Sequence, residues 1–179
     1  MKNYNPGRPD ESEYPPYSAK YVNLVPGSDI LPVFAAQLEE TTALLKPLDD
    51  RAAAFAYAPG KWTLKQVVGH VVDTERIFAY RALCVARGES GSLPGFEQDD
   101  YVAAGSFGER TLSSLLDEFR VARQATIAFF QNLPQQAWMR RGNANKFSVT
   151  VRGIAFLAAG HELHHVKILR EKYLAGLKG

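Results

Sequence analysis

Residues 154–169 read IAFLAAGHELHHVKIL, and this stretch decides how the chain folds. Apolar side chains recur every three or four positions, and two histidines continue the same stripe. Its members are Ile154, Leu157, Ala158, His161, His165, Ile168 and Leu169. This spacing places the stripe on one face of an α-helix. We therefore predict a helix that begins near 148–150, ends near Leu174 and turns the stripe toward the protein interior.

The same periodicity predicts three more helices upstream. Thr63 and Gln66 form a capping box that marks the start of the second of them, and Gly88 follows its end. Pro47 and Pro134 end the first and the third, because proline cannot continue a helix. The three helices are expected at about residues 28–46, 63–87 and 111–133.

The connection over residues 88–110 is longer than the usual link between antiparallel helices, which has about 2–8 residues. It is long enough to cross the domain, so the second and third helices can run in parallel. No segment alternates convincingly between polar and apolar residues, so we expect 134–149 to be a loop. The predicted fold class is all-α, a four-helix bundle over residues 28–179.

Residues 1–27 differ in composition from the rest of the chain. They hold five of the ten prolines and four tyrosines. Proline disfavours helix, and spaced aromatic side chains are unusual in a free linker. We expect an extended N-terminal arm laid across the bundle, with a disordered tail over 1–12 as the alternative.

Length and composition narrow the function classes. The 179 residues fit one domain, and the formal net charge of +2 is too small for a dedicated nucleic-acid binder. The single cysteine, Cys84, excludes an internal disulfide framework. No apolar run reaches about 18 residues, and the start of the chain has no apolar signal core. We expect a cytoplasmic protein that binds neither nucleic acid nor membrane.

The four histidines carry the strongest chemical signal. His161 and His165 lie four residues apart, so both project from one helix face, about 6 Å apart along the axis. Two imidazoles at this spacing can bind one metal ion. His70, in the middle of the second helix, is the remaining candidate for a third ligand. The alternative is that these are hydrogen-bonded core histidines, but two on one buried stripe favour a metal.

A site with three histidines leaves at least one metal position open, which is typical of catalytic sites. The segment 161–165 also matches the HExxH pattern of zinc proteases, with Glu162 as general base. Zinc proteases of the metzincin type have a glycine three residues after this pattern, where the chain turns back, but Ile168 stands there in this sequence. We also expect no strand that could bind a peptide by edge pairing. We therefore do not favour a protease.

Four other residues are candidates for a role around the metal or in substrate binding. Asp73 lies one turn from His70 and is expected to orient it or to bind the metal. Arg81 lies on the same side of the helix and suits an anionic substrate group. Glu162 and His164 adjoin the histidine pair. Each is also compatible with an ordinary structural role.

Several motifs together resemble the DinB/YfiT-like superfamily. They are Tyr57-Ala58-Pro59-Gly60-Lys61-Trp62-Thr63, Gly69-His70 with the following Asp73-Thr74-Glu75-Arg76, Leu93-Pro94-Gly95-Phe96 and the closing 160–165 segment. The resemblance runs from about residue 20 to the end. It implies a four-helix bundle in up-down-down-up order, a metal triad at His70, His161 and His165, and commonly a homodimer.

The resemblance also implies a divalent metal such as zinc, nickel or iron. Relatives include thiol-dependent transferases and isomerases that use low-molecular-weight thiols, and proteins described as metal-dependent hydrolases. We therefore expect a metal-dependent enzyme that acts on a small molecule, of the thiol transferase or hydrolase type. The alternative is a non-catalytic metal-binding or small-molecule-binding protein of the stress response.

Overall fold

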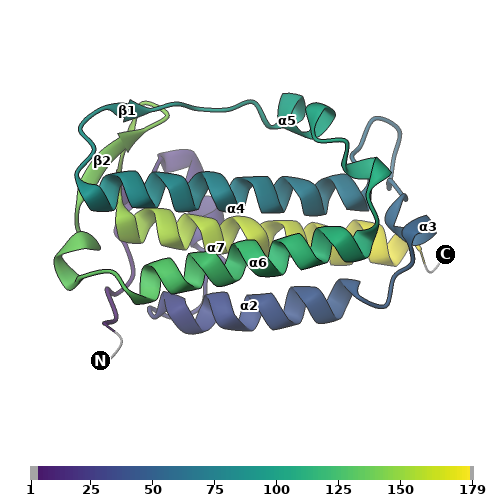
Figure 1. The fold of residues 1–179 in the computed structure, drawn as a ribbon, viewed down its shortest axis with the longest axis horizontal. Coiled ribbons are helices and arrows are strands. Elements are labelled where there is room, and N and C mark those ends of the chain that lie inside the picture. Colours follow the sequence, from purple (N-terminus) through teal and green to yellow (C-terminus); the bar gives the residue numbers. More distant parts are fainter. Residues whose placement is uncertain (1–3, 178–179) are drawn as a thin grey trace.

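Four long helices lie side by side and form the body of the protein (Figure 1). They are α2 (Ile30–Leu45), α4 (Leu64–Arg87), α6 (Leu112–Gln131) and α7 (Val151–Ile168), and a short α3 (Asp50–Ala53) follows α2. This computed structural model describes residues 4–177. The predicted helical bundle is confirmed, and the helix bounds agree with the predicted ones to within a few residues. No helix in the described part of the chain is long and apolar enough to cross a bilayer.

Local sequence signals explain where the helices begin and end. The Thr63 hydroxyl accepts a hydrogen bond from the Gln66 N–H, and the Gln66 side chain accepts one from the Thr63 N–H, which confirms the predicted capping box. Gly88 ends α4 with a φ of 86°, a left-handed conformation that glycine adopts at little cost. Asp29 caps α2, and Thr150 caps α7.

The C-terminal end of α7 differs from the expected continuous α-helix. Residues Leu169–Leu174 continue it as a π-helical turn. Tyr173 is buried in this turn, and its hydroxyl donates a hydrogen bond of 2.6 Å to the carbonyl of Trp62. The turn therefore ties the end of α7 to the residue just before α4.

The prediction of a plain loop over 134–149 was wrong, because part of it forms a small sheet. Strands β2 (Arg141–Ala144) and β3 (Phe147–Thr150) make an antiparallel hairpin, and β1 (Ser92–Leu93) pairs in parallel with β2. The strands are too short to show alternation. Asn145 and Lys146 form the hairpin turn with φ of 50° and 69°, a conformation that the sequence signals only through the asparagine.

The connection between α4 and α6 follows the outer side of the bundle (Figure 1). It contains β1 and a short helix, α5 (Gln98–Ala104), which packs against α4. Phe107 is buried after α5 and anchors the end of the connection against Gly69 of α4. The connection thereby holds the start of α5 over the middle of α4.

The N-terminal segment is in part helical, whereas the sequence led us to expect an extended arm. It contains two 3-10 turns (Glu11–Glu13 and Pro16–Ser18) and the short helix α1 (Ala19–Val22). Asp10 caps the first turn with its carboxylate, and Pro16 suits the start of the second. Residues 1–3 of the expected arm lie outside the described residues.

This N-terminal segment packs against α7. Buried Glu13 accepts a hydrogen bond of 2.6 Å from the Thr150 hydroxyl and pairs with Arg152. A Cβ added at Gly153 would lie 2.2 Å from the Glu13 carbonyl oxygen, and one added at Gly160 would lie 2.1 Å from that of Tyr21. Both glycines therefore allow the segment to approach the α7 backbone.

A buried polar network joins all four long helices at mid-height. Arg123 of α6 is fully buried and binds both carboxylate oxygens of Glu75 on α4, at 2.8 and 3.0 Å. Its third bond, of 2.8 Å, goes to the Gln37 side chain on α2, whose amide nitrogen donates to the carbonyl of Ala159 on α7. The network holds the four helices in one register close to the histidines of α7.

Candidate metal centre

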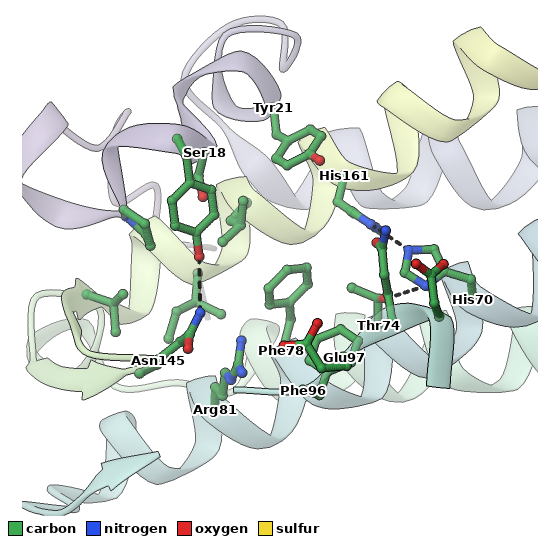
Figure 2. A pocket seen from close by; sticks show the side chains of 18 residues that line it. Ser18, Tyr21, His70, Thr74, Phe78, Arg81, Phe96, Glu97, Asn145 and His161 are labelled. Atoms are coloured by element: carbon green, nitrogen blue, oxygen red, sulfur yellow. Dashed lines mark hydrogen bonds between the residues drawn. The ribbon is translucent and has the colours of Figure 1, made fainter. Parts of the chain in front are cut away.

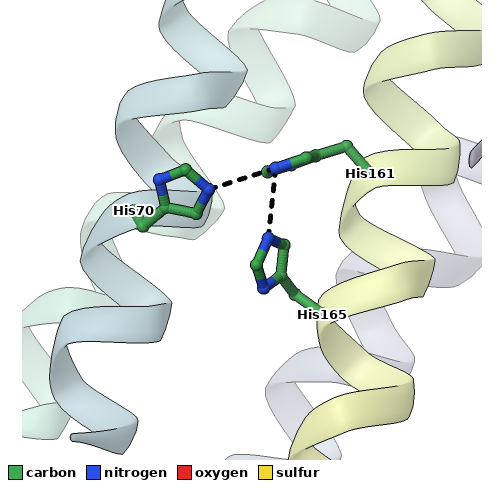
Figure 3. A group of neighbouring side chains, drawn as sticks. All are labelled: His70, His161 and His165. Carbon is green, nitrogen blue, oxygen red and sulfur yellow. Dashed lines mark hydrogen bonds between the residues drawn. The ribbon is translucent and has the colours of Figure 1, made fainter. Parts of the chain in front are cut away.

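Three histidine side chains meet between α4 and α7 (Figure 3). The Nε2 atom of His161 lies 3.1 Å from Nε2 of His70 and 3.1 Å from Nε2 of His165. One ligand atom from each residue lies within 4.8 Å of the other two. The structure thus brings together all three residues that the sequence singled out as metal ligands.

The surrounding side chains orient His70. The Thr74 hydroxyl lies 3.5 Å from its Nδ1, and the Trp62 ring packs against the imidazole at a centroid distance of 4.9 Å. With Nδ1 facing Thr74, Nε2 is directed at the other two histidines. The sequence analysis proposed Asp73 for this orienting role and missed Thr74. The signal that could have found Thr74 is its four-residue spacing from His70, which places both side chains on one face of α4.

Burial keeps these imidazoles neutral. It lowers the pKa of His70 to about 4, although Asp99 acts in the opposite direction. Burial lowers the pKa of His165 to about 3, and electrostatic interaction with His70 and His164 acts in the same direction. The pKa of His161 lies well below its usual value for the same main reason. A metal ion requires the neutral form of each imidazole, so all three are ready to bind at neutral pH.

The donor set fits a divalent transition metal. With metal–nitrogen bonds of about 2.1 Å, two donors at a right angle lie about 3.0 Å apart, and two in a tetrahedron about 3.4 Å apart. The two observed separations of 3.1 Å fall between these values. Imidazole ligands suit zinc, nickel, iron and copper. Without a cation, each of these two 3.1 Å contacts needs a proton between its nitrogens, as in an N–H···N hydrogen bond.

The other sequence candidates lie around the triad without joining it. The Asp73 carboxylate lies 3.9 Å from the Arg76 guanidinium. Glu162 points to α2, where it accepts a hydrogen bond from the Thr41 hydroxyl, and burial raises its pKa to about 7. His164 packs against the ring of Tyr21 at 5.0 Å. The Glu162 carboxylate therefore does not take the position beside the triad that a general base in a zinc protease requires.

A cavity of about 340 Å³ is lined by two members of the triad, His70 and His161 (Figure 2). His70 and His161 lie at one end of it, and Arg81 and Asn145 lie at the other. Phe78 lies between the two ends. The structure thus places Arg81 in the same cavity as the histidines, as its position on α4 suggested, whereas the part of Asn145 was not foreseen.

A second cavity reaches the triad from the side of His165. It also measures about 340 Å³, and Lys61, Trp62 and Tyr173 are among its lining residues. Gln98 and Asp99, at the start of α5, line both cavities. Sequence reasoning missed these two residues, because nothing local shows that the long connection returns to the histidines.

Comparison with known proteins agrees with this fold and shows the family. The model of the DinB superfamily matches residues 34–169, a range that contains all three histidines. YfiT from Bacillus subtilis, described as a probable metal-dependent hydrolase with an unusual four-helix bundle topology, superposes with a TM-score of 0.72 at 19% identity, over 94% of this chain and 92% of that chain. No curated protein matches the sequence significantly. The match over most of the chain shows that this protein belongs to the DinB superfamily.

Proposed function

We propose that this protein is a metal-dependent enzyme that acts on a small molecule. His70, His161 and His165 would hold one divalent ion, namely zinc, nickel or iron, and leave at least one position open to the cavity. The observation that carries the proposal is the convergence of three imidazoles, two of which, His70 and His161, are buried and line a cavity of about 340 Å³. A site with a cavity beside it favours chemistry over a purely structural role.

The residues around the triad have distinct tasks in this proposal. A bound divalent metal would supply Lewis acidity, which lowers the pKa of a coordinated water or thiol. Thr74 and Trp62 hold the His70 ring in place. Phe78 and Leu157 provide an apolar wall that displaces water from the substrate. Arg81 offers a positive charge at the far end of the cavity.

Two reaction types fit, and the cavities favour one of them. Two cavities that meet at the same triad suit two reactants, so they support the transfer of a group between a low-molecular-weight thiol and a second molecule. A hydrolase would need only one organic substrate, and the description of YfiT supports that type for YfiT. A non-catalytic binding protein remains as the alternative if neither reaction occurs.

The proposal includes the up-down-down-up helix order. Figure 1 supports it: α4 and α6 run in one direction, while α2 and α7 run in the other. This order places α4 beside α7, and these two helices pack together and supply the three histidines.

Metal binding is the first test. Protein purified without a histidine tag or chelator is dialysed against zinc, nickel or iron(II), and bound metal is measured by elemental analysis. We expect about one ion per chain. His161→Ala should lose binding, whereas His164→Ala, a matched change on the same helix, should retain it. Equal binding by both variants, or none by the natural chain, would reject the metal centre.

Activity is the second test. The metal-loaded protein is incubated with low-molecular-weight thiols plus an electrophile in one screen, and with ester and amide substrates in another. Turnover in the first screen that is lost in His161→Ala supports the transferase, and turnover in the second supports the hydrolase. Metal binding without turnover in either screen would favour the non-catalytic alternative.

A further inference from the structure

The end of the first cavity that is remote from the histidines carries a positive charge, the guanidinium of Arg81. Arg81 is half-buried and lines this cavity. Its Nη2 donates a hydrogen bond of 2.7 Å to the Pro94 carbonyl, and its guanidinium carbon lies 5.9 Å from the centre of the Phe96 ring. Within residues 4–177 it forms no ion pair with a carboxylate. That hydrogen bond holds the guanidinium in place, and its other N–H groups make no hydrogen bond to the residues that the structure describes.

Two further hydrogen-bond donors lie at the same end. Asn145, from the β2–β3 turn, directs its amide nitrogen to the Tyr17 hydroxyl at 3.5 Å. Because that hydroxyl accepts this bond, its own proton is available for another acceptor. Tyr17 is close enough to influence the pKa of Arg81 electrostatically. A guanidinium, an amide and a phenol from three separate segments therefore gather at one end of the cavity, a set suited to a negatively charged oxygen group.

The wall between this polar end and the histidines is apolar. Phe78, Ile154 and Leu157 line it. Along α4, the Cα atoms of His70 and Arg81 are about 16 Å apart, at a rise of 1.5 Å per residue. A ligand that touches both ends must therefore be elongated and apolar in its middle.

Nearby carboxylates limit the charge that such a ligand carries. Glu97 and Asp99 also line the cavity, and both are exposed. They would repel a doubly charged phosphate more strongly than a singly charged carboxylate. A carboxylate also matches the planar fork of a guanidinium.

We propose that Arg81, assisted by Asn145 and Tyr17, binds the carboxylate of an elongated, otherwise apolar substrate whose opposite end reaches the histidine triad. The proposal rests on the proposed function, because it assigns the substrate class of that same site. It makes Arg81 a specificity-determining residue that acts at a distance from the reacting atoms.

The first experiment leaves the metal out. Calorimetry on the metal-free protein compares hexanoate, hexanol and hexyl phosphate, which share one alkyl chain. We expect hexanoate to bind most tightly. Arg81→Met should weaken hexanoate binding by about tenfold or more, as for the loss of a charged hydrogen bond, and leave hexanol binding unchanged. Tyr17→Phe, a conservative change of an exposed side chain, should cause a smaller loss in the same direction.

Arg87→Met is the matched control. It removes the same charge from the same helix, but Arg87 lies outside this cavity, so hexanoate binding should not change. Circular dichroism establishes that each variant is folded. Equal hexanoate affinity for Arg81→Met and the natural chain would overturn the proposal, and so would tighter binding of hexyl phosphate, which would select phosphate instead.

The second experiment adds zinc and ω-mercaptoalkanoates of increasing length. Affinity should peak at one chain length, at which the thiol reaches the triad while the carboxylate reaches Arg81, and the peak should disappear in Arg81→Met. If zinc does not bind, the proposed function fails although the hexanoate result stands. If zinc binds and no chain length is preferred, the assignment of Arg81 fails while the metal centre stands.

Discussion

At the scale of single residues, His70 shows how neighbours prepare a ligand. Thr74 faces its Nδ1 and Trp62 covers its ring, so the remaining nitrogen points to His161. Only 2% of His70 and 8% of His161 are exposed, and burial disfavours the protonated form of both. This arrangement makes the stability of the metal-free protein depend on pH in the acidic range.

The pH dependence of stability follows from these lowered pKa values. Between the usual pKa of 6.5 and the folded-state pKa of about 4 for His70, the unfolded chain binds the proton and the folded chain does not. Stability of the metal-free protein should therefore fall as the pH drops below about 6.5, by up to about 1.4 kcal/mol per pH unit for each buried imidazole. Urea unfolding in chelator, from about pH 7.5 to about 4.5, measures this slope.

A variant separates this effect from the titration of carboxylates. His70→Gln removes one of the titrating imidazoles, so its slope below about pH 6.5 should be shallower than that of the natural chain. Identical slopes for the two proteins would show that His70 is not held in its neutral form by the fold.

At the scale of elements, α7 depends on glycine for its contact with the N-terminal segment. Alanine normally favours a helix over glycine by about 1 kcal/mol. In Gly160→Ala, however, the new Cβ would lie 2.1 Å from the Tyr21 carbonyl oxygen. We expect a net loss of about 1–3 kcal/mol in the free energy of unfolding, because the backbone of α7 or of the N-terminal segment must move to relieve this contact. Gly108→Ala, where the new Cβ meets no atom within 4 Å, should lose much less, and thermal unfolding compares the two.

The buried network that joins the four long helices predicts a second stability effect. Arg123→Met removes the partner of Glu75 and leaves a carboxylate uncompensated in the core, which should cost about 3–5 kcal/mol. Arg120→Met is the control on the same helix, since Arg120 pairs with Asp117 at the surface and should contribute about 0–1 kcal/mol. Urea unfolding distinguishes the two. Similar small losses would mean that the core tolerates the unpaired Glu75.

At the scale of the whole molecule, the histidines link elements that are distant in the sequence. His70 and His161 are separated by 91 positions, and their Nε2 atoms lie 3.1 Å apart. A metal held by both would join α4 to α7 in the folded protein only. Metal should therefore stabilise the folded protein, and a chelator should reverse the effect.

The size of this stabilisation depends on the zinc concentration relative to the dissociation constant. Zinc at about one hundred times its dissociation constant should raise the free energy of unfolding by about 2.7 kcal/mol. Unfolding midpoints with zinc and with chelator measure the difference, which should vanish in His70→Ala and persist in His164→Ala. A zinc effect that survives in His70→Ala would place the ion elsewhere.

Much of the architecture could be predicted because its signals are local. Thr63 and Gln66 cap α4, Gly88 ends it, and the four-residue spacing of His161 and His165 brings their side chains together on one helix. The hairpin over 141–150 could not be predicted, because its strands have only four residues each and depend on pairing with each other and with β1. The helical turns of the N-terminal segment were missed for a similar reason, since their proline-rich sequence is stabilised by contacts with α7.

The amino-acid order alone specified four amphipathic helices, a histidine pair on one face and a third histidine suited to join it, because helical periodicity is a property of neighbouring residues. Only the folded structure decided that Thr74 rather than Asp73 faces His70, that Glu162 points to α2, and that Asn145 and Asp99 reach the cavities. Those positions depend on how helices and loops distant in the sequence pack, and that packing depends on the shape of the whole core.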